Sequence, residues 1–195
     1  SLGEFVDSSE EIVDAAVKAA VKASSGWALT PGPSRSAILY KAIESLEQHR
    51  EEIARIMTKE QGKPLKESLG EIGKSIAESK FMVGEGLRLY GQTSSSEKAN
   101  SWTKTVRVPV GPIAAITPWN FPILTPLRKI MPALVTGNTV VLKPSELTPR
   151  TALRIAEIFS EAGLPNGVFN VVTGGAKAGM ALIQHPDIRA ITFTG

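Results

Sequence analysis

The sequence predicts an α/β protein in which a set of N-terminal helices precedes a mainly parallel sheet. In the first half of the chain, apolar residues recur at helical spacing. From Gly111 onward, short continuous apolar runs alternate with helical segments. Strands of that kind are buried on both faces, and the repeated strand-helix-strand order implies right-handed crossovers between parallel strands.

The elements of the first half follow from this spacing and from local stop signals. Gly62 is expected to end one helix, and Pro64 can open the next. Beyond the helices, the alternation around Trp102 and Val106 is typical of a strand at a sheet edge. The predicted elements are a helix over about 8–24, one long or two short helices over 38–61, a helix over 64–89, a polar loop over 91–100, and an exposed or edge strand over 101–109.

The second half contains four apolar runs that predict buried strands. The helices between them have clear ends, such as the Thr148-Pro149 pair that opens one of them. Pro132 falls inside another, where it should cost about 3 kcal/mol or force a kink. The predicted strands are 113–116, 139–143, 168–172 and 190–194, and the predicted helices are 126–136, 149–162 and 177–184.

Composition restricts the class of function. With 195 residues and 42% hydrophobic content, the chain can bury a sizeable core. Its 22 basic and 19 acidic residues are interleaved, so the net charge of +3 gives little support for nucleic-acid binding. We expect no membrane span, because no apolar run approaches about 18 residues. The lack of cysteine and of a leader-like N-terminus favours a cytoplasmic location.

Ligands of parallel sheets bind beyond the carboxyl ends of the strands, so candidate residues were sought there. The motif "AITPWNFP" holds Asn120 in a stiff bend after the first strand, since each proline pushes its predecessor toward an extended conformation. A preorganised side-chain amide of this kind can stabilise an oxyanion. The alternative interpretation is that asparagine simply suits a turn.

The next two strand ends offer groups for a nucleotide. Lys143 and Glu146 in "VVLKPSELTP" suit the vicinal hydroxyls of a ribose, one as donor and the other as acceptor. In "VVTGGAKAG", glycines would let the backbone approach a ligand. Each also has a structural interpretation: a snorkelling lysine, a carboxylate placed for a helix dipole, and glycines that only turn the chain. His49 and His185 lack ligand-spaced partners, so no metal site is predicted.

These motifs together resemble the NAD(P)-dependent aldehyde dehydrogenase superfamily, specifically its N-terminal portion up to the FTG motif. The segments "AAITPWNFP", "PALVTGNTVVLKPSELTP", "EAGLPNGVFNVVTG" and the final "FTG" follow the family's order and spacing, and "EQGKPLKES" matches its helical part. The resemblance covers essentially the whole chain. It implies a Rossmann-like sheet that binds NAD, with NADP possible, and oxidation of a small-molecule aldehyde to a carboxylic acid through a cysteine thioester.

The resemblance also implies roles for individual residues. Asn120 would be catalytic, as the side-chain part of an oxyanion hole. Lys143 and Glu146 would hold the adenosine ribose, and Glu146 favours NAD because it would repel a 2′-phosphate. The cofactor-binding set it implies is Ile116, Thr117, Pro118, Trp119, Lys143, Ser145, Glu146, Gly175, Gly179, Phe193 and Gly195.

The resemblance also implies three parts of the chain: a helical N-terminal part of the cofactor domain at 1–92, an edge or oligomerisation strand at 93–110, and a truncated NAD-binding part at 111–195. A homo-oligomer, either a dimer or a tetramer, is expected of the full-length form. The family's nucleophilic cysteine and glutamate base lie beyond the FTG motif, so we expect a catalytically inactive fragment. The alternatives are a CoA-acylating aldehyde dehydrogenase and a non-catalytic fragment that binds a nucleotide or a partner.

Overall fold

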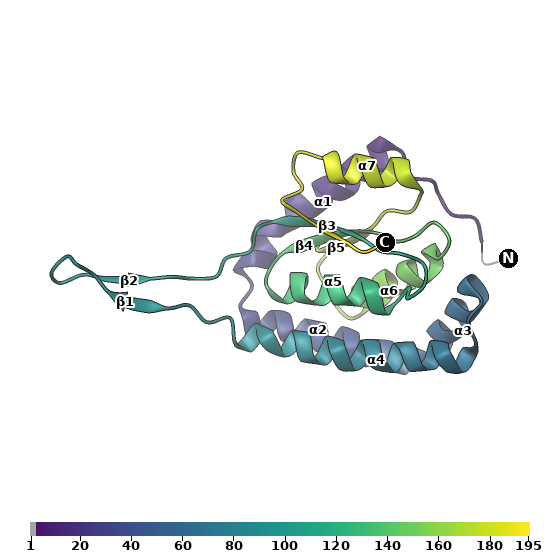
Figure 1. The fold of residues 1–195 in the computed structure, drawn as a ribbon, viewed down its shortest axis with the longest axis horizontal. Coiled ribbons are helices and arrows are strands. Elements are labelled where there is room, and N and C mark those ends of the chain that lie inside the picture. The colour runs from purple at the N-terminus through teal and green to yellow at the C-terminus, as the bar shows by residue number, and fades with distance from the viewer. Residues whose placement is uncertain (1–2) are drawn as a thin grey trace.

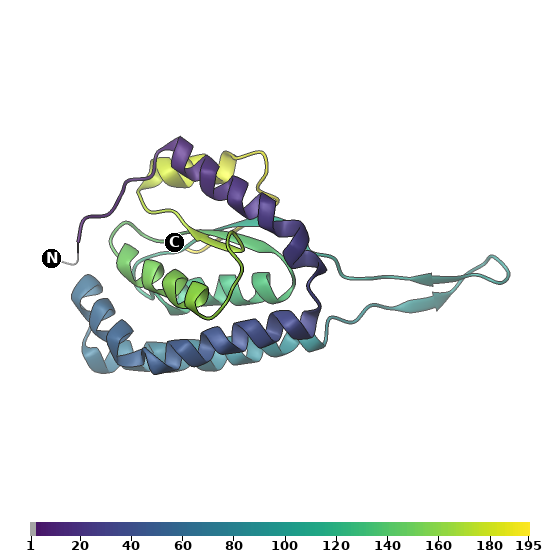
Figure 2. The ribbon, with the colours of Figure 1, turned by 180° about the vertical axis from the view of Figure 1, so that it is seen from behind.

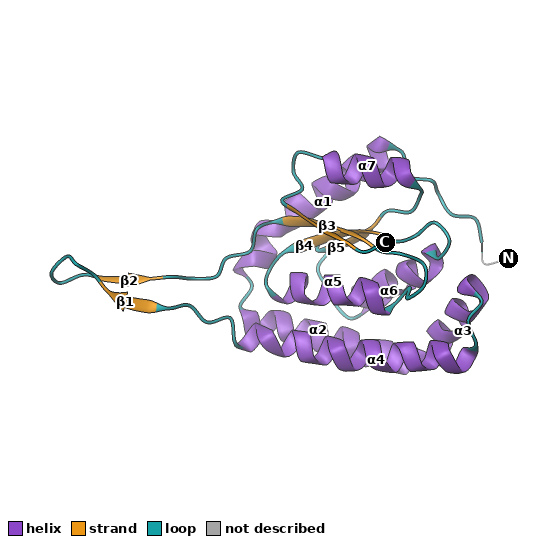
Figure 3. Ribbon diagram, in the orientation of Figure 1, coloured by secondary structure: helices purple, strands orange, loops and turns teal. Residues whose placement is uncertain are grey.

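The computed structural model describes residues 3–195 and confirms the predicted α/β class. Its centre is a parallel sheet with strand order β5-β4-β3-β6. Figure 3 shows this sheet between two sets of helices, with a separate hairpin outside them. In chain order the elements are α1 (Glu10–Leu29), α2 (Gly32–Gln48), α3 (Arg50–Gln61), α4 (Leu65–Gly84), η1 (Glu85–Leu87), β1 (Thr93–Ser95), β2 (Trp102–Lys104), β3 (Pro112–Ile116), α5 (Leu124–Val135), β4 (Thr139–Lys143), α6 (Pro149–Glu161), β5 (Phe169–Val171), α7 (Ala176–Gln184) and β6 (Ala190–Phe193).

Helices cover both faces of the sheet. Helices α1 and α7 lie on one face, while α5 and α6 lie on the other, with α2, α3 and α4 packed beyond them (Figure 1). Successive residues of a strand point to opposite faces, and in β4 this places Val141 in the smaller core under α1 and α7. Its neighbours Val140 and Leu142 belong to the larger core on the helical side. The central strand β4 is therefore buried on both faces of the sheet.

The outer strands differ from the prediction of strands buried on both faces. Strand β6 alternates between half-buried and exposed residues, and β5 is half-buried throughout. The reason is their position, because each forms an edge of the four-stranded sheet. Within the described residues, only β3 and β4 have a neighbouring strand on both sides.

The segment after α4 forms a two-stranded antiparallel sheet that projects away from the body (Figures 1 and 2). The strand prediction over 101–109 is confirmed only for Trp102–Lys104, and it pairs with Thr93–Ser95 instead of the main sheet. The prediction of a polar loop at 91–100 is therefore wrong at Thr93–Ser95. Small hydroxylated residues carry little strand signal on their own, but here they gain a partner strand. Every residue of both strands is exposed.

Several helix boundaries follow the predicted signals. Gly62 ends α3 in a left-handed conformation at φ 89°, and its N–H donates to the carbonyl of Thr58. Helix α1 is longer than expected and runs past Ser24 to Leu29, because buried Trp27 anchors its last turn by donating from Nε1 to Leu134 O at 2.9 Å. Pro132 lies within α5 without ending it.

No helix in the part of the chain that the structure describes is long and apolar enough to cross a membrane.

Candidate functional site

Three predicted residues from separate motifs meet at the carboxyl edge of the sheet. Ile116 at the end of β3 is in register with Lys143 on β4 and with Phe193 on β6. Beyond them, Thr117 N donates to Lys143 O at 3.2 Å, and Thr194 N donates to Ile116 O at 3.1 Å. The strand ends therefore form one continuous rim, which is where ligands of such sheets bind.

Lys143 holds a buried ammonium at this rim. Its side chain is 8% exposed, and Nζ donates to Pro144 O at 2.8 Å and to Gly174 O at 2.7 Å. Burial lowers the pKa of Lys143, and the nearby carboxylates of Glu146 and Asp7 partly oppose that shift. An ammonium has three donors, so one N–H remains for Glu146 or for a ligand.

Glu146 and Ser145 occupy the loop that follows. The Glu146 carboxylate lies 3.7 Å from Lys143 Nζ and is 61% exposed, so its oxygens can accept hydrogen bonds from a ligand. Ser145 is buried, and its hydroxyl accepts a hydrogen bond from Leu147 N at 3.2 Å. This hydrogen bond stabilises the turn of the loop that carries Glu146.

The glycine loop after β5 lies against the N-terminal segment of the chain. A side chain at Gly174 would meet Asp7 Oδ1 at 2.4 Å, and φ is +128° there. Gly175 N donates to the same Asp7 oxygen at 3.3 Å. A Cβ at Gly179 would lie 3.5 Å from Lys143 Cδ, so this glycine adjoins the lysine stem. Sequence reasoning missed Asp7, because its partner is more than 160 residues away.

Asn120 lies in the loop between β3 and α5. It is exposed, and its side chain makes no hydrogen bond within residues 3–195. Trp119 beside it is half exposed, Pro118 is half-buried, and Gly195 lies against the exposed ring of Phe193. The hydroxyl of Thr117 is buried and has no hydrogen-bond partner in the described part of the chain.

Three charged residues that sequence reasoning missed also approach this rim. Lys63 and Glu71 from the helical part contact the Asn120 loop. Lys129 on α5 donates from Nζ to Thr192 Oγ1 on β6 at 3.0 Å, and burial lowers its pKa. Lys129 follows Arg128 in the sequence, and nothing in that basic pair distinguishes Lys129 from a solvated helix charge. Lys63 lies in the segment EQGKPLKES between Gly62 and Pro64, but nothing in its spacing or in that of Glu71 indicates a contact with the Asn120 loop.

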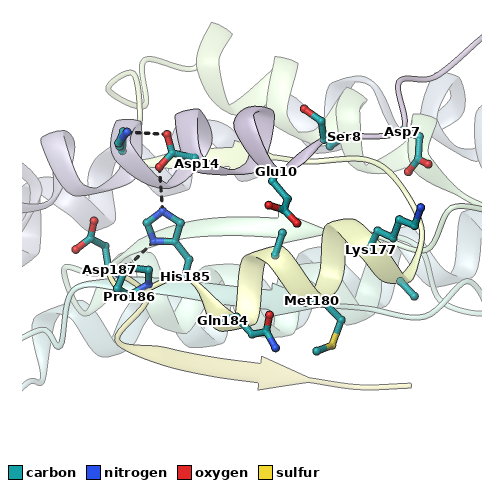
Figure 4. A pocket seen from close by; sticks show the side chains of 14 residues that line it. Asp7, Ser8, Glu10, Asp14, Lys177, Met180, Gln184, His185, Pro186 and Asp187 are labelled. Atoms are coloured by element: carbon teal, nitrogen blue, oxygen red, sulfur yellow. Dashed lines mark hydrogen bonds and ion pairs between the residues drawn. The ribbon is translucent and has the colours of Figure 1, made fainter.

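A separate groove of about 1070 Å³ runs between α1 and α7 (Figure 4). His185 Nδ1 accepts from Asp187 N at 3.1 Å, so the hydrogen lies on Nε2, which faces Asp14 Oδ1 at 3.3 Å. Lys18 and His185 lower the pKa of Asp14. This histidine thus links two helices. Among residues 3–195, no group of three or more acidic or histidine side chains could hold a metal ion.

Comparisons with known proteins match these observations. The model of the aldehyde dehydrogenase family matches residues 1–195. The chain is 44% identical to the α-ketoglutaric semialdehyde dehydrogenase of Bacillus subtilis, over 100% of this chain and 40% of that protein. The chain thus spans less than half the length of that relative.

Two solved structures bear on the cofactor. An NADP-dependent enzyme of E. coli has a TM-score of 0.94 and 40% identity, covering 97% of this chain and 40% of its own. PnpE in complex with nicotinamide adenine dinucleotide has a TM-score of 0.91 and 36% identity, covering 95% of this chain and 38% of its own.

Proposed function

The chain belongs to the aldehyde dehydrogenase family, and on that premise we propose that it is the nucleotide-binding part of an enzyme that oxidises an aldehyde to a carboxylic acid. The observation that carries the proposal is the rim formed by Ile116, Lys143 and Phe193 at one level of the sheet. It unites residues from three motifs at the place where a dinucleotide would bind.

The chemistry of the rim fits a nicotinamide dinucleotide. Lys143 has one ammonium N–H left to donate and Glu146 has carboxylate oxygens to accept, which together suit the two hydroxyls of a ribose. The buried Thr117 hydroxyl has no hydrogen-bond partner among residues 3–195 and can also serve a ligand. Gly179 leaves the Lys143 stem uncovered by a side chain. When bound, the nicotinamide supplies the hydride acceptor.

Asn120 is proposed as the oxyanion donor. Its side-chain amide has no partner among residues 3–195 and lies in a loop bounded by two prolines. A donor that is already oriented costs no reorganisation when negative charge develops on the aldehyde oxygen. The binding half and the catalytic half of the site would then both lie on loops that follow β3 and β4.

The covalent part of the reaction needs a thiol. The chain contains no cysteine, so its own residues cannot supply the nucleophile for a thioester. We therefore propose that these 195 residues bind the dinucleotide but do not turn over an aldehyde by themselves. The cytoplasmic location expected from the sequence remains a prediction.

NAD is proposed over NADP. Glu146 is largely exposed beside the ribose-binding lysine, and its negative charge would repel a 2′-phosphate. The similar E. coli enzyme is NADP-dependent and the similar PnpE was solved with nicotinamide adenine dinucleotide, so this fold accommodates both cofactors. Replacing Glu146 with glutamine should raise the affinity for NADP relative to NAD, as measured by titration with each.

Homo-oligomerisation through the β1–β2 hairpin is also proposed. The hairpin projects from the body and exposes Trp102, and its only strand pairing within the described residues is between β1 and β2. An exposed ribbon of this kind has free edge groups that another chain can pair with. Sedimentation of the protein with and without residues 92–105 would test this.

The decisive experiment compares two polypeptides. The full-length product of the gene should form NADH only when an aldehyde is present and release the free acid, with the same product when CoA is added. The isolated 195 residues should bind NAD without turnover. An acyl-CoA product would instead identify the CoA-acylating alternative. Binding of neither NAD nor NADP by either polypeptide would favour a partner-binding module, and turnover by the isolated chain would overturn the need for cysteine.

A further inference from the structure

The loop that carries Asn120 is fixed at both of its ends. At its start, Thr117 N donates to Lys143 O at 3.2 Å. At its end, the amides of Ile123 and Leu124 both donate to Glu71 Oε1 at 3.1 Å. Glu71 on α4 therefore caps the N-terminus of α5 from another helix.

Lys63 fixes the middle of the same loop. Its Nζ donates to Glu71 Oε2 at 2.5 Å and to the backbone carbonyl of Asn120 at 2.9 Å. It also lies 4.8 Å from the centre of the Phe121 ring, in a cation–π contact. The side chains of Lys63 and Glu71 are only 10% and 2% exposed. This is a buried ion pair whose spare hydrogen-bonding groups are directed to the loop.

The two prolines do not restrict the backbone torsions of Asn120, and Lys63 acts there. Each proline fixes its own φ and restricts the residue before it, so Pro118 acts on Thr117 and Pro122 acts on Phe121. Neither restricts the rotation that places the Asn120 carbonyl. The ammonium of Lys63 binds that carbonyl, and so fixes the peptide plane that follows Asn120.

We propose that Lys63, held by Glu71, is a positioning residue that orients the Asn120 side chain toward the reacting oxygen. The inference rests on the proposed function, in which the Asn120 amide donates to an oxyanion. Because that amide has no other partner within residues 3–195, its direction depends on the backbone that Lys63 holds.

The test uses the full-length gene product and measures kcat, the KM for aldehyde and the dissociation constant of NAD. Lys63→Met should lower kcat by about 10- to 100-fold, since a displacement of about 1 Å at a catalytic group has effects of this order. Affinity for NAD should stay unchanged, because Lys63 touches none of the predicted ribose contacts. Lys63→Arg, which keeps the charge, should recover most of the loss.

A matched control removes a different ion pair, one that joins α4 to α5. Glu78 on α4 accepts from Arg128 on α5 at 2.6 and 2.7 Å, away from the Asn120 loop. Glu78→Gln should change kcat by less than about twofold. Lys63→Met leaves the buried Glu71 carboxylate without its cationic partner. The double variant Lys63→Met with Glu71→Gln is neutral at both positions and keeps an acceptor for the amides of Ile123 and Leu124.

Combination with Asn120→Ala separates positioning from general damage. If Lys63 acts through Asn120, then Lys63→Met should cause no further loss of kcat in the Asn120→Ala protein. Backbone amides around Phe121 should also exchange hydrogen faster in Lys63→Met than in the wild type. The global stability of the double variant, Lys63→Met with Glu71→Gln, should not fall. Losses that multiply in the combined variant, or an unchanged kcat in Lys63→Met, would overturn the inference. Full activity of Asn120→Ala would instead remove the oxyanion assignment and the basis of this inference with it.

Discussion

In the proposed site, the ammonium group of Lys143 would combine a structural role with a binding role. Two of its donors tie the carbonyls of Pro144 and Gly174 together, which joins the loops after β4 and β5. The third is left at the rim, beside Glu146. A buried ammonium stays charged only where hydrogen bonds to the protein replace its hydration shell. The contacts with Pro144 and Gly174 that keep Lys143 charged therefore also orient its third N–H.

Replacing this lysine should weaken dinucleotide binding. We expect Lys143→Met to raise the dissociation constant of NAD at least tenfold, because a hydrogen bond to a charged group contributes roughly 1.5–3 kcal/mol. Calorimetric titration would measure it. Lys41→Met, at an exposed lysine on α2, is the control and should leave the constant unchanged. Equal affinity in Lys143→Met would remove Lys143 from the binding set.

The Glu78–Arg128 pair predicts a pH dependence of stability. Hydrogen bonding from Arg128 lowers the pKa of Glu78 below 4.5 in the folded state. The pair therefore stabilises fully above pH 4.5, and its contribution is lost as the pH falls through the lowered pKa. The pair is partly exposed, so we expect about 0.2–1 kcal/mol. Urea unfolding of wild type and Glu78→Gln should differ at neutral pH and converge in acid.

At the scale of elements, the close packing of η1 against α2 and α5 depends on the glycine at position 86. A Cβ at Gly86 would lie 2.2 Å from Ser36 Oγ on α2 and 2.5 Å from Val135 Cγ2 on α5. Both distances are below what real Cβ contacts allow. Helices α2 and α5 can therefore approach η1 only because residue 86 is glycine.

This close approach predicts opposite effects for two glycines. Gly86→Ala should destabilise the fold by about 1–3 kcal/mol through overpacking. Gly70→Ala, in the middle of α4 with nothing within 4 Å of the new Cβ, should stabilise it by about 0.5–1 kcal/mol. Urea unfolding would measure both. A destabilised Gly70→Ala would mean that helix propensity does not govern α4.

Some of these structural elements can be predicted from the sequence, and others cannot. Strands β3 and β4 and the stop at Gly62 follow from local patterns, because apolar runs and a left-handed glycine act over a few residues. The pairing of Thr93–Ser95 with Trp102–Lys104 does not, since hydroxylated residues gain strand structure only from their partner.

The residues of the candidate site also fall into those that the sequence indicates and those that only the structure reveals. Lys143 and Asn120 lie within short motifs, and the resemblance of those motifs to the family's predicts their roles. Three other residues reach the rim from distant segments, namely Lys63, Glu71 and Asp7. The sequence around each of them resembles that of an ordinary charged helix or loop residue. Long-range contacts of that kind are determined by packing, which no local pattern reports.

At the scale of the whole molecule, the sheet has an uncovered margin. On β6, Ile191 is 52% exposed and Phe193 is 65% exposed. Their strand pairs only with β3 in the described residues, so its other side has free backbone groups. An apolar edge of this kind favours association with another chain.

We therefore expect the isolated 195 residues to self-associate, and a charge on the edge to oppose this. Ile191→Lys should reduce the apparent mass in light scattering at a given concentration, because charged edge residues hinder strand pairing. Val21→Lys, at an exposed position on α1 away from the edge, is the control. No reduction for Ile191→Lys would mean that another surface drives association.

The order in which the molecule is made also matters, because α1 packs on elements that come much later. Its apolar face, formed by Val13 and Val17, packs against the sheet and α7, and Val172 just after β5 and Leu182 on α7 belong to the same smaller core. At a synthesis rate of roughly 5–20 residues per second, about 8 to 30 s pass between these segments. During that interval α2, α3 and α4 can already pair on the ribosome, whereas α1 remains uncovered. We expect α1 to be the segment that chaperones hold and proteases cut while the chain is still growing.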